Sequence, residues 1–242
     1  MFEFLKNIMN NEKASLKNDL NPVHRILNTN IKKEPNSQED EIIFGCGCFW
    51  GAEKCFWKLP GVVTTSVGYA GGDKINPTYY EVCSGVTGHS EVVRIIWDKK
   101  EIDISDLLKM FWECHDPTQK NRQGNDTGTQ YRSAIYYKKE NNKKIIISSK
   151  DQYQNELNKK NMGLIETEIK MIDTYYYAEQ YHQQYLASFG SRQYCSASPT
   201  KIKLGEFKGS NYKLKNDIWE NFNWEVDKCV LRSDNNPIKK SI

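Results

Sequence analysis

A chain of 242 residues with 38% hydrophobic and 12% aromatic residues can bury one substantial core, which excludes a wholly disordered protein. The net charge is +3 with lysines and glutamates interspersed, so the sequence lacks the basic stripe of a nucleic-acid-binding protein. Seven cysteines at irregular spacing exclude the regular framework of a small secreted disulfide-rich domain.

The distribution of apolar residues bears on the location of the protein. Residues 1–17 contain Glu3 and no sustained apolar stretch, which makes them a poor secretory signal peptide. No segment reaches the apolar length that spans a bilayer. We therefore expect a cytoplasmic protein with mostly free thiols, although an organelle stays open, and we expect neither a membrane nor a nucleic acid as its partner.

The chain is predicted to divide into three parts. Residues 1–39 are predicted to be a partly disordered N-terminal extension that ends in a linker rich in charged and turn residues. The folded domain is predicted over residues 40–200. Residues 201–242 are predicted to form a C-terminal extension with one aromatic cluster, DIWENFNWEVD.

Within the folded domain, the spacing of apolar residues predicts the order strand, helix, strand, strand, helix, strand. The first helix carries Cys55 on its apolar face and is stopped by Pro60, and Ser105 is expected to cap the second. This order is typical of a two-layer α/β fold with a ferredoxin-like split β-α-β core. The predicted core strands are 41–46, 62–72, 90–98 and 131–137.

Three further elements are expected beyond this core, followed by an extended tail. They are a long polar helix over 140–160, a strand over 166–173 and a helix over 178–189. The predicted fold is therefore a small α/β core with additional C-terminal helices.

Three cysteines fall within the stretch GCGCFWGAEKCFW, residues 45–57. Cys48 is placed where a strand passes through a glycine turn into a helix, so its sulfur should face the unpaired amides and positive dipole end of that helix. We expect this placement to lower the thiol pKa and to make the sulfur a nucleophile near neutral pH. Phe49 and Trp50 lie too early in the helix to pack wholly inward, and are expected to wall an apolar pocket beside the sulfur.

The other cysteines have plainer interpretations. A buried cysteine is most often an inert small hydrophobic residue, which suits Cys46, Cys55, Cys83 and Cys114. The chain has no C-x-x-C motif, and its C-x-C-x₆-C spacing has no second pair. Neither a metal site nor a thioredoxin-type redox motif is therefore expected. Spacing alone supports one reactive cysteine and nothing finer.

Five sequence blocks follow one another along the predicted domain. They are GCFWG at 47–51, VGYAGG, NPTYYEVCSGVTGHSEVVRI, FWECHDPTQKNRQGNDTGTQYRSAIYY and YYAEQYHQQYL. Over about residues 41–195 these blocks resemble the type A peptide methionine sulfoxide reductases. The block GCFWG is similar to the active-site signature of that family. The resemblance implies an α/β fold, in agreement with the spacing, and the thiol-dependent reduction of methionine S-sulfoxide, free or in oxidised proteins.

The resemblance implies roles for individual residues. Cys48 matches the nucleophile, and Glu91 matches the acid that serves the sulfoxide oxygen. A carboxyl at the start of a buried strand is expected to have a raised pKa and to stay protonated near neutral pH. Tyr79 and Tyr131 match two hydroxyl donors to the same oxygen, and Asp126 matches a supporting position.

The resemblance also implies how the substrate is held and how the thiol is restored. Phe49 and Trp50 match the residues that hold the substrate methyl group. Cys195, in a segment rich in small residues that we expect to be mobile, matches the cysteine that condenses with a sulfenic acid on Cys48 to form a disulfide. An external thiol reductant, thioredoxin or dithiothreitol, then reduces this disulfide, with no cofactor and no metal. We expect a monomer.

Two features depart from the family pattern. Many members carry a further recycling cysteine shortly after the resolving one, but the segment SASPTKIKLG has none here. Cys229 is the only later thiol, and it either passes the disulfide outward or is unused. Cys46 occupies a position where other members often have a non-thiol residue, and we expect it to be inert.

Two other functions compete with the reductase. A thiol peroxidase or redox sensor uses the same kind of reactive cysteine and resolving partner, but a peroxide needs neither a methyl pocket nor this proton donor. A binding module that holds oxidised peptides without turnover would not need both Cys48 and Glu91. The presence of Glu91, Tyr79 and Tyr131 favours the reductase.

Overall fold

The computed structural model describes residues 20–239 of the chain. Its strands are β1 (Glu39–Cys46), β2 (Val62–Ala70), β3 (Ser90–Asp98), β4 (Arg122–Gln123), β5 (Asp126–Thr127), β6 (Ser133–Tyr137), β7 (Glu168–Met171) and β8 (Tyr175–Tyr177). Its helices are α2 (Phe49–Trp57), α3 (Tyr79–Cys83), α4 (Ile104–Cys114), α5 (Asn141–Lys159), α6 (Asn216–Glu220) and α7 (Cys229–Arg232). Short 3₁₀ helices occupy Thr129–Tyr131, Gln180–His182 and Tyr185–Ala187.

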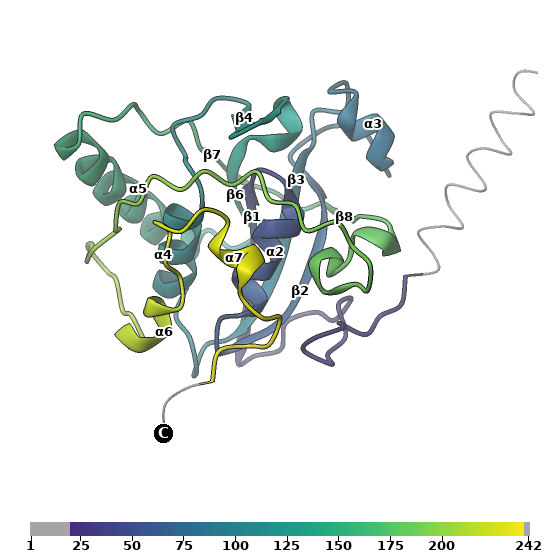
Figure 1. Cartoon of the computed structure of the whole chain (residues 1–242), viewed down its shortest axis with the longest axis horizontal. Coiled ribbons are helices and arrows are strands. Elements are labelled where there is room, and N and C mark those ends of the chain that lie inside the picture. The colour runs from purple at the N-terminus through teal and green to yellow at the C-terminus, as the bar shows by residue number, and fades with distance from the viewer. Residues whose placement is uncertain (1–19, 240–242) are drawn as a thin grey trace, which may run out of the picture.

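The fold is a central six-stranded sheet with helices packed against it, which confirms the α/β prediction. The sheet order is β7-β6-β1-β3-β2-β8. β3 lies between β1 and β2 and runs antiparallel to both, which is the strand placement of a split β-α-β unit. α2 packs on β2 and β3, α4 packs beside α2, and α5 packs against α4 (Figure 1).

The two-residue period of the strands decides which side chains face the helices. On β3, Val93, Ile95 and Trp97 belong to the core between the sheet and the helices, while Val92 belongs to a smaller cluster on the opposite face. Because alternate residues share a face, Glu91 at the start of this strand also points toward the helix layer. The strand pattern thus sends a carboxyl toward the start of α2.

The predicted helix over residues 178–189 is wrong. Two short 3₁₀ helices, Gln180–His182 and Tyr185–Ala187, occupy this region, and Gln184 between them has a left-handed conformation with a φ of 48°. The Gln183 side chain bonds to both backbone groups of Val67, and the Gln184 side chain donates to Glu53 at 2.7 Å. These buried side-chain bonds fix a chain path that a continuous helix cannot follow.

The predicted cap of the second helix is also wrong. Asp103, two residues before Ser105, is the N-cap of α4. Its carboxylate accepts from the Ser105 amide at 2.9 Å, and Asp106 accepts from the Asp103 amide at 3.1 Å. This reciprocal pair is a capping box, in which an acidic side chain replaces the hydroxyl that the sequence suggested.

Both predicted extensions contribute to the folded body where the structure describes them. His24 and Ile31 in the N-terminal part are fully buried, and His24 Nε2 lies 2.9 Å from the Thr65 hydroxyl. In the C-terminal part, Phe222 and Trp224 of the aromatic cluster are buried in the main core. Residues 1–19, within the predicted N-terminal extension, lie outside the described residues.

Asp106 is one of the buried carboxylates that attach the C-terminal part to α4. Asp106 accepts hydrogen bonds from the backbone amides of Lys213 at 3.0 Å and Leu214 at 3.2 Å, besides its bond in the capping box. Among residues 20–239, no helix combines the length and the apolar character needed to cross a membrane.

Replacing Asp106 by Asn is expected to lower the free energy of unfolding by about 1–3 kcal/mol, because the amide nitrogen places a donor opposite backbone N–H groups. Urea unfolding followed by tryptophan fluorescence measures this loss. The matched change Asp151→Asn on the exposed surface of α5 should leave the midpoint unchanged. Equal midpoints for the two variants would contradict an anchoring role for Asp106.

Candidate active site

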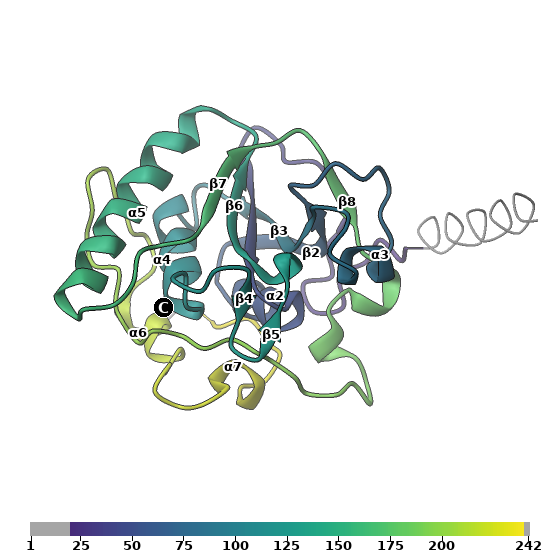
Figure 2. The same cartoon turned by 90° about the horizontal axis from the view of Figure 1, so that it is seen from above.

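Cys48 lies at the junction between β1 and α2, as predicted. It is the N-cap residue of α2, and Gly47 before it has a φ of 88°, a conformation that favours glycine. The β4-β5 pair lies over this junction (Figure 2), and a Cβ on Gly47 would overlap the side chain of Gln123. The glycine turn therefore both redirects the chain and leaves room for β4.

Glu91 meets the start of α2 from the sheet. The Phe49 amide donates to Glu91 Oε2 at 3.1 Å, and the Glu91 side chain is fully buried. Burial raises the pKa of Glu91 to about 8, and the nearby carboxylate of Asp126 adds to the increase. Glu91 is therefore mainly protonated at pH 7, which confirms the expectation from the sequence.

The pKa of Cys48 differs from the expectation. Burial raises the pKa of this thiol well above its usual value, and the charge of Glu91 acts in the same direction. The Trp50 amide at the helix start favours the thiolate, as the helix-end placement predicts, but its effect is smaller. The prediction of a lowered pKa is therefore wrong for the resting site, because it counted the helix end and not the loss of water.

A pocket of about 380 Å³ brings most of the predicted site residues together. Its lining residues are Cys48, Phe49, Trp50, Tyr79, Glu91, Asp126, Tyr131, Tyr185, Arg192 and Tyr194. Seven of these come from five different elements and were all candidates from the sequence. The two remaining candidates, Cys195 and Cys229, do not line this pocket.

The two predicted hydroxyl donors keep their protons in this pocket. Burial raises the pKa of Tyr79 and of Tyr131, and the charge of Glu91 raises both further. Both phenols are therefore neutral over the physiological range and can donate hydrogen bonds to an oxygen atom in the pocket. Three proton-bearing groups thus line the same pocket as the thiol.

The apolar wall of the pocket is built from stacked rings. Trp50 stacks on Tyr185 with ring centroids 3.9 Å apart, and its indole N–H donates to His182 Nδ1 at 3.1 Å. Phe49 is 1% exposed, so the expectation that it would not pack wholly inward is wrong. His182 lies against both Phe49 and Tyr79, at centroid distances of 5.0 and 4.4 Å.

Several residues of this wall had no role assigned from the sequence. His182 and Tyr185 belong to the block YYAEQYHQQYL, which was recognised as a whole without separate functions. Tyr194, next to Cys195, donates from its hydroxyl to Asp126 Oδ1 at 2.5 Å. The tyrosines that recur every four residues in that block, at 177, 181 and 185, were the available signal, and the irregular path of the chain concealed which side chains face the pocket.

Cys195 packs against α2 rather than standing free in solvent. It is 9% exposed, and a Cβ on Gly51 would overlap its sulfur. Burial raises the pKa of Cys195 to about 12. Cys195 also lines a second cavity of about 140 Å³ together with Cys229 of α7. The Cys195 thiol thus lies close enough to interact electrostatically with both Cys48 and Cys229.

Comparison with known proteins decides the family. Residues 40–215 match the family model described as peptide methionine sulfoxide reductase. The chain belongs to this family. It is 51% identical over 181 residues to the peptide methionine sulfoxide reductase MsrA of Vibrio vulnificus, covering 75% of this chain and 86% of that protein. It is 55% identical over 165 residues to MsrA of Pseudomonas putida, covering 68% and 74% of the two chains.

Solved structures of the reductase family share the fold. Methionine sulfoxide reductase A of Corynebacterium diphtheriae superposes with a TM-score of 0.63 and 42% identity, covering 71% of this chain and 82% of that chain. Mxr1 from Saccharomyces cerevisiae in reduced form superposes with a TM-score of 0.60 and 34% identity, covering 68% and 92%. The matched residues 40–215 contain the whole active-site pocket and Cys195, but Cys229 lies beyond them.

Replacing Gly51 by Ala is expected to displace the Cys195 sulfur while leaving Cys48, Glu91 and the two tyrosines in place. Formation of a Cys48–Cys195 disulfide should slow by about 10- to 100-fold, as expected for a misplacement of roughly 1 Å. Mass spectrometry of samples quenched after addition of methionine sulfoxide measures the rate. Gly163→Ala, where a Cβ would make only ordinary van der Waals contact with Thr118, is the matched control. Equal rates for both variants would contradict this seating of Cys195.

Proposed function

We propose that this chain reduces methionine S-sulfoxide, free or in oxidised proteins, to methionine. The observation that carries the proposal is the convergence of one thiol, one protonated carboxyl and two phenol hydroxyls on a pocket with an aromatic wall. A sulfoxide needs this combination, because its sulfur becomes electrophilic only when its oxygen receives a proton or strong hydrogen bonds.

The first step is attack of the Cys48 sulfur on the sulfoxide sulfur. Glu91 transfers its proton to the sulfoxide oxygen, and the proton of the Cys48 thiol replaces it on the carboxyl. Tyr79 and Tyr131 donate hydrogen bonds to the same oxygen. The net charge of the buried pocket is unchanged by this exchange, so the attack does not require a free thiolate in the resting site.

The aromatic wall selects the other end of the substrate. Phe49 and Trp50 hold the methyl group, since an apolar surface favours a methyl over water. With the methyl against the rings and the oxygen against the donors, one configuration at sulfur places its lone pair away from Cys48. We assign the S epimer to this arrangement on the basis of the family resemblance. Asp126, bonded to Tyr194, supports the pocket from its rim.

The second step restores the thiol. Methionine leaves, and the oxygen stays on Cys48 as a sulfenic acid. The Cys195 thiol attacks this sulfur, water departs, and a Cys48–Cys195 disulfide forms. An external dithiol, thioredoxin in the cell or dithiothreitol in vitro, reduces the disulfide by exchange. All of the groups involved belong to one chain, so a monomer suffices, and no cofactor takes part.

Cys229 is proposed as a recycling thiol for this disulfide. It lines the same cavity as Cys195, it is half-buried, and its segment is tied to α2. The Lys54 ammonium donates to the Ser233 carbonyl at 2.7 Å, and the Trp57 indole donates to the Asn235 carbonyl at 3.0 Å. Attack of Cys229 on Cys195 would move the disulfide away from the active-site pocket and free Cys48.

Counting products tests the reaction directly. The fully reduced chain, mixed with excess methionine S-sulfoxide and no reductant, should release its first methionine with the loss of two thiols. Cys195→Ser should still release one methionine but form no Cys48–Cys195 disulfide, whereas Cys48→Ser should release none. Release of methionine by Cys48→Ser, or none by the wild-type chain, would refute the reductase proposal.

The acid role predicts a pH profile. Only protonated Glu91 serves the oxygen, and its pKa is raised to about 8, so activity should be present below that pH and decline as the pH rises through it. Glu91→Gln should reduce kcat by about 10²- to 10⁴-fold and flatten this decline. Glu166→Gln, at an exposed position, is the control. A Glu91→Gln variant that keeps the wild-type kcat and the same decline above pH 8 would rule out this acid.

A further inference from the structure

Five of the seven cysteines line the second cavity. They are Cys46 of β1, Cys55 of α2, Cys114 of α4, Cys229 of α7 and Cys195. Sequence spacing assigned three of them, Cys46, Cys55 and Cys114, to inert core packing. The proposed reaction uses Cys195 and Cys229, which leaves these three buried thiols in the same cavity without a function.

Helix α2 arranges the reactive sulfur atoms in a row. Positions 48, 51 and 55 are separated by three and four residues, so they share one face of the helix. Residue 51 is glycine, and the Cys195 sulfur lies where a side chain at this position would begin. The order along this face is therefore Cys48, Cys195 and Cys55, with Cys55 about one helical turn beyond the resolving sulfur.

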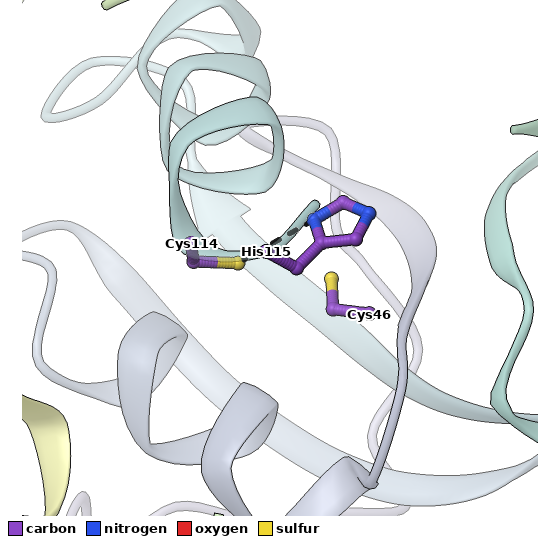
Figure 3. A group of neighbouring side chains, drawn as sticks. All are labelled: Cys46, Cys114 and His115. Carbon is purple, nitrogen blue, oxygen red and sulfur yellow. Dashed lines mark hydrogen bonds between the residues drawn. The ribbon is translucent and has the colours of Figure 1, made fainter. Parts of the chain in front are cut away.

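Cys114 extends the row into the core. Its thiol interacts with the thiols of both Cys55 and Cys46, and all three line the second cavity. The sulfur atoms of Cys46 and Cys114 and a ring nitrogen of His115 all lie within 4.8 Å of one another (Figure 3). All three cysteines are at most 4% exposed. Cys55 and Cys114 line the same cavity and their thiols interact directly, so the two side chains are adjacent, as a disulfide requires.

The neighbouring imidazole favours a thiol pair over a metal site. His115 Nδ1 lies 2.7 Å from the Phe111 carbonyl, which only accepts, so this nitrogen carries the ring proton. His115 Nε2 lies 2.7 Å from the Ser133 hydroxyl, which donates to it. Both nitrogens are therefore engaged, and the ring has no free lone pair to offer a metal ion.

We propose that Cys55 and Cys114 form a second redox-active dithiol, which takes over the oxidising equivalents of the Cys48–Cys195 disulfide and stores them as a buried Cys55–Cys114 disulfide. The proposal rests on the proposed reductase function, which supplies the first disulfide. It makes Cys195 the link between the active-site pocket and the buried pair.

The transfer consists of two thiol–disulfide exchanges. The Cys55 sulfur attacks the Cys195 sulfur, the Cys48–Cys195 bond breaks, and Cys48 leaves and takes up the proton lost by Cys55. The Cys114 sulfur then attacks the Cys55 sulfur, and Cys195 leaves and takes up the proton lost by Cys114. Cys55 and Cys114 are oxidised by two electrons, and Cys48 and Cys195 are reduced by two.

The transfer has a countable consequence. Once Cys48 and Cys195 are thiols again, the chain can reduce a second sulfoxide before it meets any reductant. The adjacent Cys114 thiol, together with burial, raises the pKa of Cys55 well above the usual value, and burial does the same for Cys114, so the thiolate needed for exchange is scarce. The second methionine should therefore appear more slowly than the first.

The test removes Cys229 so that only the buried thiols of the second cavity can accept the disulfide. Reduced full-length Cys229→Ser chain is mixed with excess methionine S-sulfoxide and no reductant, and methionine and remaining thiols are counted. The proposal predicts two methionines and four thiols lost per chain, with Cys48–Cys195 and Cys55–Cys114 disulfides in the peptide map. One methionine, with Cys48–Cys195 as the sole disulfide, would overturn it.

Matched variants locate the acceptor. Cys114→Ala and Cys55→Ala, each in the Cys229→Ser background, should return the yield to one methionine, while Cys83→Ser, at a thiol that does not line this cavity, should leave it at two. Loss of the second methionine in Cys46→Ala but not in Cys55→Ala would refute the Cys55 pairing. The peptide map of Cys229→Ser needs no core substitution, so it decides the matter even if a variant folds poorly. A chain that releases no methionine would instead refute the reductase function.

Discussion

The active site depends on one interaction, the hydrogen bond between the Phe49 amide and the Glu91 carboxyl. This bond is buried away from water. It joins Phe49, the first residue of α2, to Glu91, the second residue of β3, and β3 is the central strand of the split β-α-β unit. Because Cys48 directly precedes Phe49, the same bond fixes the separation of thiol and carboxyl. Burial at this point also determines the protonation state of both groups.

Burial favours the catalytic form of Glu91 but disfavours that of Cys48. It raises the pKa of Glu91 to about 8, which provides an acid near neutral pH. It also raises the pKa of Cys48, which disfavours the nucleophile. Keeping both Glu91 and Cys48 neutral in the resting site avoids an unpaired charge on either buried group, whose cost would be several kcal/mol. Catalysis in such a site depends on the substrate oxygen, which accepts the proton that the pocket cannot release to water.

Local pattern was sufficient to predict the elements that carry the first half of the site. The alternation on β3 and the glycine turn before α2 place Glu91 and Cys48, and neither depends on distant residues. It failed for residues 178–189, whose path is set by Gln183 and Gln184 bonding to β2 and α2. Nothing in the sequence of that segment shows whether the two glutamine side chains are buried in hydrogen bonds or exposed to solvent. The pKa of Cys48 was mistaken for a related reason, since the helix end is visible in sequence but the degree of burial is not.

Helix α2 contacts functional residues that lie far apart in the sequence. Its first residue contacts the acid, its middle turns seat Cys195 against Gly51, and its last turn holds the C-terminal segment. There Lys58 donates to the Asp234 and Asn236 carbonyls at 3.1 Å, and the Ile238 amide donates back to Lys58. The C-terminal segment therefore forms one wall of the second cavity. These bonds at the end of α2 fix the position of Cys229 relative to Cys195. The region that matches the family model ends at residue 215. The second cavity is completed by Trp224 and residues 226–230, which lie beyond that region.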